Sequence, residues 1–276
     1  MTPILRADRV AFRFSGPEAH RLLNDVVTGH IPDADNDTAS LWALLSPQGK
    51  ILAEGLAGFA DDALWLDVHS SVADDFFKRM RMYRLRAKVE IDDLRESHRV
   101  GFATEPSHLA HRDRQGPVEL GYRVIAPIEA TAGWSTDETP YHAARIANGI
   151  LHLGNDFAAN EAFAHDIGMD QLEGIDFVKG CYVGQEVVSR MKHRGTARRR
   201  PVIVSGLTNA EAGNPIIANG REAGQIGQVV DGKAVAIVRL DRITDLSAVT
   251  VLDLPVALSL PAWASYQFGD TTPDED

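Results

Sequence analysis

The sequence of 276 residues contains a single cysteine and no long apolar run. One cysteine excludes an internal disulfide and indicates a reducing compartment. No apolar stretch reaches the roughly 18 residues that a membrane-spanning helix requires. The N-terminus, Met-Thr-Pro-Ile-Leu-Arg-Ala-Asp, lacks the charged start and apolar run of a secretory signal. We therefore expect a cytoplasmic protein that does not enter a membrane.

Familiar catalytic signatures are also missing. The sequence has no Gly-x-Ser-x-Gly, no P-loop and no His-Glu-x-x-His. Ten histidines are present, but no spacing matches a zinc or di-iron motif, so no metal site is expected. The pattern Gly224-Gln-Ile-Gly227 lacks a strand–helix–strand context and is interpreted as a turn.

Positive charge is scarce and unevenly distributed. The net charge is −11, yet residues 78–88 carry six cations and no acid, and residues 179–200 carry seven cations and one acid. The acidic remainder makes direct nucleic-acid binding, for example to tRNA, the less favoured alternative. Two basic islands favour local capture of an anion, although each could equally be a solvated helix face.

The pattern of strands and helices predicts an α+β protein ending in an antiparallel β-barrel. Hairpins, rather than repeated strand–helix–strand units, dominate the first part. The segment 104–121 is polar and is interpreted as a loop, whereas short apolar runs separated by turns after Pro201 indicate the barrel. We divide the chain into an N-terminal α+β module (1–95), a second α+β module (96–196), the barrel (197–268) and an acidic, disordered tail (269–276).

The single cysteine lies in the octapeptide Lys179-Gly-Cys-Tyr-Val-Gly-Gln-Glu186, which precedes an expected helix over 185–193. Glycines on both sides of Cys181 allow a ligand to approach the backbone closely. A helix N-terminus and a nearby cation, Lys179, would both stabilise a thiolate. The alternative is that Cys181 is a small buried apolar residue, which is the commoner fate of a free cysteine.

The octapeptide, followed by Val-Val-Ser-Arg and Arg194-Gly195, resembles the hallmark of the YgfZ family, folate-binding proteins related to the T-protein (aminomethyltransferase) of the glycine cleavage system. Other segments resemble this family in the same order. They are Ser15-Gly-Pro-Glu-Ala19 with Leu22-Leu-Asn-Asp-Val-Val-Thr28, Leu44-Leu-Ser-Pro-Gln-Gly-Lys50, Tyr83-Arg-Leu-Arg-Ala-Lys-Val89 and Arg145-Ile-Ala-Asn-Gly-Ile150. The resemblance covers about residues 4–260.

The resemblance implies three modules in a ring around a central site for tetrahydrofolate or a one-carbon derivative. It further implies a role in the assembly or repair of iron–sulfur proteins, including iron–sulfur enzymes that modify tRNA. Iron–sulfur proteins or cluster carriers would then be transient partners. Lys179 and Cys181 correspond to the lysine and cysteine of the family motif, and Tyr141 stands where an aromatic residue lines the folate site in some members.

A folate site needs an aromatic slot, a polar group for the pterin edge and cations for the glutamate tail. Side-chain capability, together with the resemblance, assigns Tyr141 and Tyr182 to the slot. Gln185 or Glu186 would meet the pterin, although Glu186 could equally be a partner of the helix dipole. The cations expected to meet the tail are Lys179, Arg145 and Arg190.

One cysteine cannot hold an iron–sulfur cluster alone, because clusters usually take four thiolates. Cys181 could be one ligand of a cluster shared with a partner, a sulfur acceptor or a redox-sensitive thiol. The alternative function is a tetrahydrofolate-dependent, aminomethyltransferase-like enzyme, which would need a positioned acid. Asp67 is the nearest candidate for that acid, although an aspartate at a strand end or turn commonly has a structural role.

Overall fold

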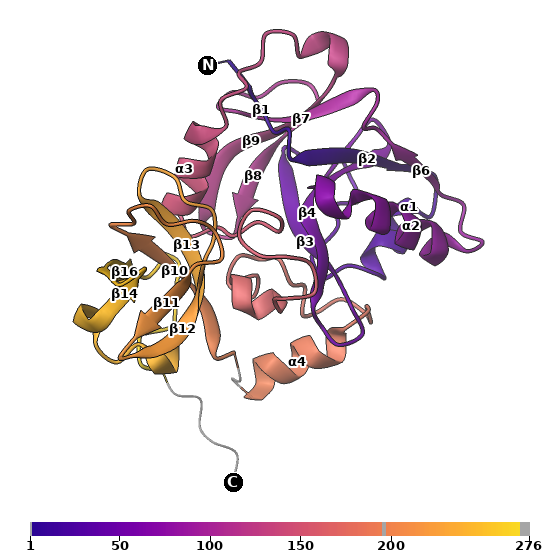
Figure 1. The fold of residues 1–276 in the computed structure, drawn as a ribbon. Coiled ribbons are helices and arrows are strands. Elements are labelled where there is room, and N and C mark those ends of the chain that lie inside the picture. Colours follow the sequence, from indigo (N-terminus) through magenta and orange to yellow (C-terminus); the bar gives the residue numbers. More distant parts are fainter. Residues whose placement is uncertain (1, 195–196, 271–276) are drawn as a thin grey trace.

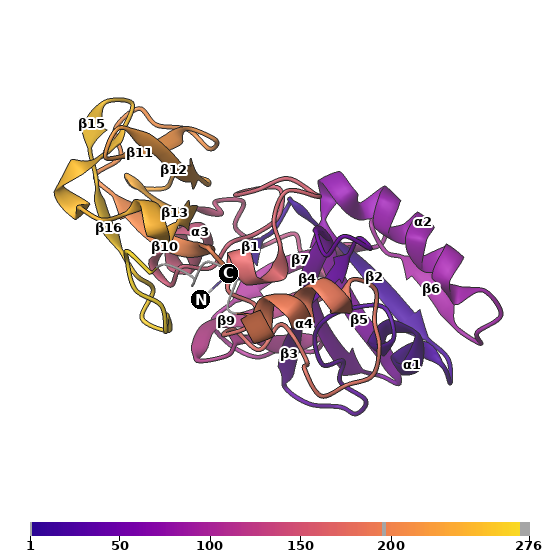
Figure 2. The ribbon, with the colours of Figure 1, turned by 90° about the horizontal axis from the view of Figure 1, so that it is seen from below.

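The structure is a computed structural model that describes residues 2–194 and 197–270. Two β-sheets organise the chain, one of nine strands and one of seven (Figure 1). The smaller sheet stands apart from the larger one when the molecule is seen from below (Figure 2). None of the described helices is both long and apolar enough to cross a bilayer.

The nine-stranded sheet contains every strand before residue 128. Its order is β1-β7-β9-β8-β3-β4-β5-β2-β6. The strands are β1 (Ile4–Leu5), β2 (Arg9–Ser15), β3 (Thr38–Leu45), β4 (Ile51–Ala60), β5 (Ala63–His69), β6 (Glu90–Asp93), β7 (His98–Ala103), β8 (Ala110–Gln115) and β9 (Val118–Pro127).

Two groups of antiparallel strands meet in this sheet through one short parallel contact. Only two residue pairs, Thr38 with Arg112 and Ala39 with Asp113, connect β3 to β8. Strands from 1–95 and from 96–196 therefore lie mainly on opposite sides of this junction. However, β1 pairs with β7, so the first strand joins the second group. The division into modules at residue 95 stays a prediction.

Four α-helices and five short 3₁₀ helices accompany the sheets in the described part of the chain. The α-helices are α1 (Ala19–Asn24), α2 (Ala73–Arg84), α3 (Thr139–Ala147) and α4 (Gln185–Arg194). The 3₁₀ helices are η1 (Ser70–Val72), η2 (Ile128–Ala130), η3 (Ala164–Ile167), η4 (Leu240–Arg242) and η5 (Leu246–Ala248).

Helix α2 shows how the sequence produces an element and its packing. Asp74 and Asp75 occupy its first turn, where carboxylates complement the helix dipole. Phe76 recurs at helical spacing with the buried Met80 and packs on Phe12, with ring centroids 5.2 Å apart. This apolar stripe closes the main core over one face of the sheet.

Two expectations about local structure are wrong. The segment 104–121 is not a loop, because it contains β8 and the start of β9. In β8 the buried positions are the polar residues His111, Asp113 and Gln115, so the strand carries no apolar alternation. Gly224 is not in a turn either, because it lies within β12 and pairs with Val238. A Cβ there would lie 2.1 Å from the carbonyl oxygen of Ile237, so glycine permits a close approach of the two strands.

The expected C-terminal barrel is confirmed as a nearly closed antiparallel sheet. Its order is β15-β14-β11-β12-β13-β10-β16, around a separate apolar core. The strands are β10 (Arg199–Ser205), β11 (Pro215–Ala218), β12 (Arg221–Ile226), β13 (Lys233–Arg239), β14 (Val249–Val251), β15 (Leu254–Pro255) and β16 (Ala257–Ser259). The acidic tail expected at 269–276 lies, from residue 271 onward, outside the described residues.

Candidate functional site

The octapeptide forms an exposed loop that leads into α4. Cys181 is exposed, so the expectation of a buried apolar cysteine does not apply. Its neighbour Gly180 is also exposed, and a Cβ placed there would meet nothing within 4 Å. The thiol is therefore accessible to another molecule.

Lys179 fastens this loop to the segment that follows α1. Its Nζ donates to the carbonyl oxygen of Gly29 at 2.6 Å and lies 5.3 Å from the centre of the Tyr182 ring. Burial lowers the pKa of Lys179 to about 8, although Asp176 and Asp25 partly oppose this shift. Asp176 also accepts hydrogen bonds from the backbone N–H of Val178 and Lys179. Lys179 therefore positions the loop through a hydrogen bond to the backbone carbonyl group of Gly29.

The start of α4 rests on the hairpin between β3 and β4. Gly184 has φ +82°, and a Cβ there would lie 2.8 Å from the carbonyl oxygen of Ser46. Gly49, in the hairpin turn, would similarly meet the side chain of Val187 at 2.8 Å. Two glycines, one in each element, therefore permit this close contact. The side chain of Val188, in α4, is buried.

The other residues predicted to bind folate are divided between this loop with α4 and a separate part of the molecule that contains α3. Tyr182 is buried in the main core, and burial raises its pKa to about 12. Gln185 donates to the carbonyl oxygen of Gly180 at 3.4 Å, whereas Glu186 and Arg190 are exposed on α4. Tyr141 belongs to α3 and packs on Phe102, in a different cluster from Tyr182. In Figure 1, α3 and α4 lie in different parts of the molecule.

Arg145 has no exposed surface and joins α3 to the barrel. Its Nη1 donates to Asp156 at 2.7 Å and its Nη2 donates to Gln228 at 2.6 Å. Asp156 also accepts from the backbone N–H of Gln228 at 3.0 Å. This buried network stabilises the contact between the barrel and the preceding part of the chain. The proposed role of Arg145 at a folate tail stays a prediction.

An internal cavity lies where the two groups of strands meet, and Tyr141 is part of its wall. Six of its fifteen lining residues are buried charged side chains. They are Arg6, Arg9, Glu54, Asp67, Asp113 and Arg123, with His152 alongside. Sequence reasoning noted Asp67 but missed most of this set. The alternation His111-Arg-Asp-Arg-Gln115 is the signal that could have revealed a strand with a polar inner face.

The charged groups of the cavity are largely paired with one another. Arg9 donates to Asp67 at 2.7 Å and to Glu54 at 2.8 Å, and Arg123 donates to the second oxygen of Asp67 at 3.1 Å. Asp67 therefore accepts from two arginines and is not free to act as the acid of an aminomethyl transfer. By contrast, Nδ1 of His152 has no hydrogen-bond partner among the described residues, and burial lowers the pKa of that histidine well below its usual value.

This cavity does not fit a folate with its side chains where they are. The free space is about 20 Å³, which is enough for about one water molecule. Pockets for ligands of this size usually measure roughly 300 Å³ or more. A pterin would have to displace Arg9, and this would break two buried ion pairs.

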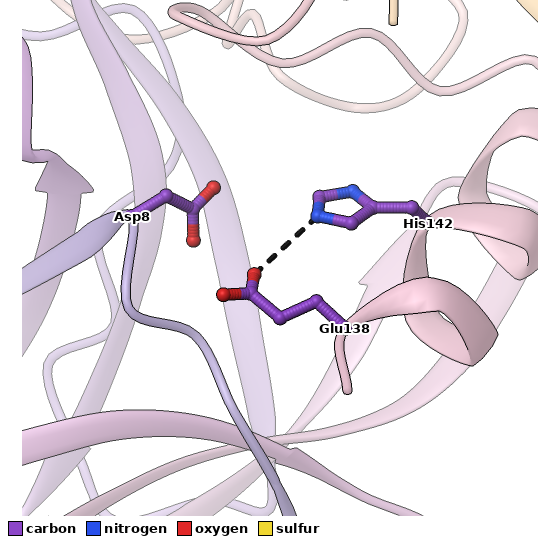
Figure 3. Close-up of side chains that lie close together, drawn as sticks. All are labelled: Asp8, Glu138 and His142. Carbon is purple, nitrogen blue, oxygen red and sulfur yellow. Dashed lines mark ion pairs between the residues drawn. The ribbon is translucent and has the colours of Figure 1, made fainter. Parts of the chain in front are cut away.

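One cluster of potential metal ligands occurs among the described residues, formed by Asp8, Glu138 and His142 (Figure 3). Nε of Arg145 donates to Nδ1 of His142 at 2.9 Å, so the lone pair of that nitrogen is already engaged. A neutral His142 then carries its proton on Nε2, which lies 3.4 Å from Glu138. Arg6 binds both oxygens of Asp8. Arg6 and Arg145 therefore already engage atoms of this cluster that a metal ion would need.

Comparison with solved structures identifies the fold. The chain is similar to the glycine cleavage system aminomethyltransferase T from Bartonella henselae, with a TM-score of 0.72 and 14% sequence identity, over 96% of this chain and 87% of that one. Residues 198–266 match the family model of the CAF17 C-terminal beta-barrel domain. The predicted T-protein-like α+β fold with a C-terminal barrel is therefore confirmed.

Curated relatives carry names that refer to iron–sulfur clusters. The chain is similar to proteins named iron-sulfur cluster assembly factor IBA57 homolog, mitochondrial. It is 28% identical to the one from Pyricularia oryzae over 84% of this chain, and 29% identical to the one from Mycosarcoma maydis over 71%. It spans 70% and 55% of the lengths of these two relatives.

The expectation of a cytoplasmic protein is contradicted by these relatives, whose names place them in mitochondria. The inference from cysteine content could not separate the two compartments, because the lack of an internal disulfide indicates only a reducing environment and names no compartment.

Proposed function

We propose that this protein supports the assembly or repair of iron–sulfur proteins. In this role the thiolate of Cys181 is the one ligand that the protein contributes to the cluster. The observation that carries the proposal is an exposed thiol on a loop that Lys179 and Asp176 hold in place. The similarity to proteins named as iron–sulfur cluster assembly factors supports it. The cluster is cargo here, and since one thiolate cannot hold it, the remaining ligands come from a partner.

Complementation tests this proposal. In a strain deleted for the gene, we expect Cys181→Ala to accumulate normally but to fail to restore iron–sulfur enzyme activities, including those of tRNA-modifying enzymes. His193→Ala, a change of another exposed residue near the C-terminal end of α4, should restore them. If Cys181→Ala restores these activities as well as wild type does, the thiol has no part in the function.

Tetrahydrofolate binding is the finer hypothesis that the family resemblance implies. The T-protein-like fold supports this hypothesis. The small free volume of the cavity, about 20 Å³, opposes it. We expect calorimetric titration of the purified protein with tetrahydrofolate to give no saturable binding. Saturable binding that Tyr141→Ala abolishes and Lys179→Ala preserves would place the folate in the cavity and contradict this expectation.

An aminomethyltransferase-like enzyme is less favoured, because both oxygens of Asp67 accept hydrogen bonds from buried arginines. Turnover of an aminomethyl donor by the purified protein with tetrahydrofolate would support this alternative instead.

A further inference from the structure

His165, in η3, has a buried imidazole ring without a hydrogen-bond partner. The residue is 1% exposed, and neither Nδ1 nor Nε2 is hydrogen-bonded to any other residue that the structure describes. A neutral imidazole has one donor and one acceptor, so both are left unsatisfied. Buried polar groups are nearly always paired, and an exception calls for an explanation. The folded state thus holds a side chain that water would satisfy.

Phe177 packs against this imidazole from the segment that leads to Cys181. The centres of the two rings lie 6.4 Å apart. The ring of Phe177 also packs on the main core, and Nζ of Lys192, on α4, lies 3.4 Å from its centre. The contacts of Phe177 therefore connect η3, the segment before the octapeptide and α4.

The residues from Phe177 to Cys181, called here the strap, are held in place mainly by polar contacts apart from the Phe177 ring. Val178 is 95% exposed. The polar contacts are the hydrogen bond of Lys179 to the backbone carbonyl group of Gly29 and the two backbone hydrogen bonds to Asp176. Local opening of a segment with so few apolar contacts costs less free energy than unfolding of the core.

Charged groups reach His165 from neighbouring elements. Arg200, on β10, donates to the carbonyl oxygen of His165 at 2.9 Å and to Asp170 at 2.7 Å. Burial lowers the pKa of His165, and Asp170 opposes this shift. Arg200 and Lys192, which are cations, lower the pKa further. The imidazole is therefore neutral at pH 7 while Phe177 packs against it, and it binds a proton more readily once water reaches the ring.

We propose that the strap opens at the contact between Phe177 and His165, and that this opening lets the thiolate of Cys181 enter the ligand set of a partner's cluster. The proposal deepens the proposed function and rests on it for what Cys181 binds. Opening returns both imidazole nitrogens to water, which offsets part of the free energy lost with the contacts of Phe177. Lys192 acts in the opposite sense, because its contact with the Phe177 ring stabilises the closed strap.

Exchange of amide protons with water, measured by NMR on the purified full-length protein, reports the opening. The probes are the N–H groups of Val178 and Lys179, which donate to Asp176 while the strap is closed. The closed strap binds fewer protons than the open one, in which the imidazole has a pKa of about 6.5. We therefore expect the opening equilibrium constant to rise by up to about tenfold from pH 7.5 to pH 5.5. His165→Leu, which removes both nitrogen atoms, should lower this constant about tenfold at pH 7.5 and remove its pH dependence.

Two further histidines serve as controls. His30 is exposed, and its Nδ1 lies 3.9 Å from Asp176, so its protonation would strengthen that pair and oppose opening. His30→Ala should therefore keep the pH dependence, and so should His193→Ala, at an exposed position on α4. Lys192→Met, also at an exposed position, should increase opening about twofold or more. Unchanged opening or a retained pH dependence in a folded His165→Leu overturns the proposal, and so does unchanged opening in Lys192→Met.

Complementation tests whether opening matters for function. His165→Leu should unfold at the temperature of wild type or higher, yet restore iron–sulfur enzyme activities less well, because Cys181 stays in the closed strap. His165→Gln keeps a polar side chain that water satisfies. It should open and complement as wild type does at pH 7.5, without the pH dependence. Full complementation by a His165→Leu variant with reduced opening would refute the functional role of the strap.

The strap and the proposed function can fail separately. If Cys181→Ala abolishes iron–sulfur enzyme activities while amide exchange is unaffected by His165→Leu, only the strap is wrong. If His165→Leu slows exchange but Cys181→Ala complements fully, the thiol role is wrong and the strap opens for another purpose.

Discussion

Asp113 is buried in the wall of the cavity, and burial raises the pKa of its carboxyl group to about 6 from 3.8. Gln115 donates to it at 2.9 Å, which only partly offsets the burial. Between pH 3.8 and 6 the folded state therefore binds more protons than the unfolded state, so stability falls as pH rises through this window. Above pH 6 the buried carboxyl group of Asp113 is ionised, and its burial lowers the free energy of unfolding.

We predict that Asp113→Asn increases the free energy of unfolding by about 1–3 kcal/mol at pH 7.5, because a neutral amide needs no buried charge. The difference from wild type should shrink toward zero near pH 3.8. Denaturant unfolding across this range measures it. Asp35→Asn, at an exposed carboxyl group, is the control and should show no such pH dependence. A destabilised Asp113→Asn at pH 7.5 would mean that the charge is needed by the neighbouring arginines.

Residue types alone did not reveal what Lys179 does. The sequence placed it two residues from Cys181 and predicted that the ammonium group would stabilise a thiolate. In the structure its Nζ donates to the carbonyl oxygen of Gly29, 150 positions away in the sequence, and the effect on the thiol stays a prediction. A partner so distant along the chain depends on the tertiary fold, and no local pattern encodes it.

At the scale of elements, the octapeptide contains two glycines with different surroundings. Gly184 has φ +82° and lies against the carbonyl oxygen of Ser46, whereas Gly180 has open space around it. We predict that Gly184→Ala lowers the free energy of unfolding by about 1–3 kcal/mol, because it adds strain and a clash. Gly180→Ala should change it by less than about 0.5 kcal/mol.

Hydrogen exchange can locate the effect of these two variants. In Gly184→Ala, amides from Tyr182 to Val188 should exchange faster, since the start of α4 loses its support on the hairpin. Equal behaviour of the two alanine variants would show that the contact between Gly184 and Ser46 does not hold the helix in place.

Elements with apolar periodicity could be predicted, and those with a polar interior could not. The strand over Thr38–Leu45 can be predicted from the sequence, because its inner residues are apolar. Strand β8 was missed, because its inner residues are polar and two of them, Asp113 and Gln115, line the cavity. The same reason hid the cavity itself, whose members are spread over β2, β4, β5, β8 and β9 and become neighbours only through sheet order.

At the scale of the whole molecule, the barrel is connected to the rest through the buried network of Arg145, Asp156 and Gln228. Gly227 lies directly against this network, because a Cβ there would be 2.3 Å from Oδ1 of Asp156. Neither side chain of the Arg145–Asp156 pair has exposed surface, so displacing one partner leaves an uncompensated buried charge.

We predict that Gly227→Ala separates the unfolding of the barrel from that of the nine-stranded sheet. Its added methyl group moves Asp156 away from Arg145, at a cost of about 3–5 kcal/mol, typical of a broken buried ion pair. Calorimetry should then resolve two transitions where wild type gives one, with the barrel unfolding first. Gly133→Ala, at a glycine with nothing within 4 Å of its added Cβ, should keep a single transition. A single transition for Gly227→Ala at the wild-type temperature would show that the network of Arg145, Asp156 and Gln228 does not couple the barrel to the sheet.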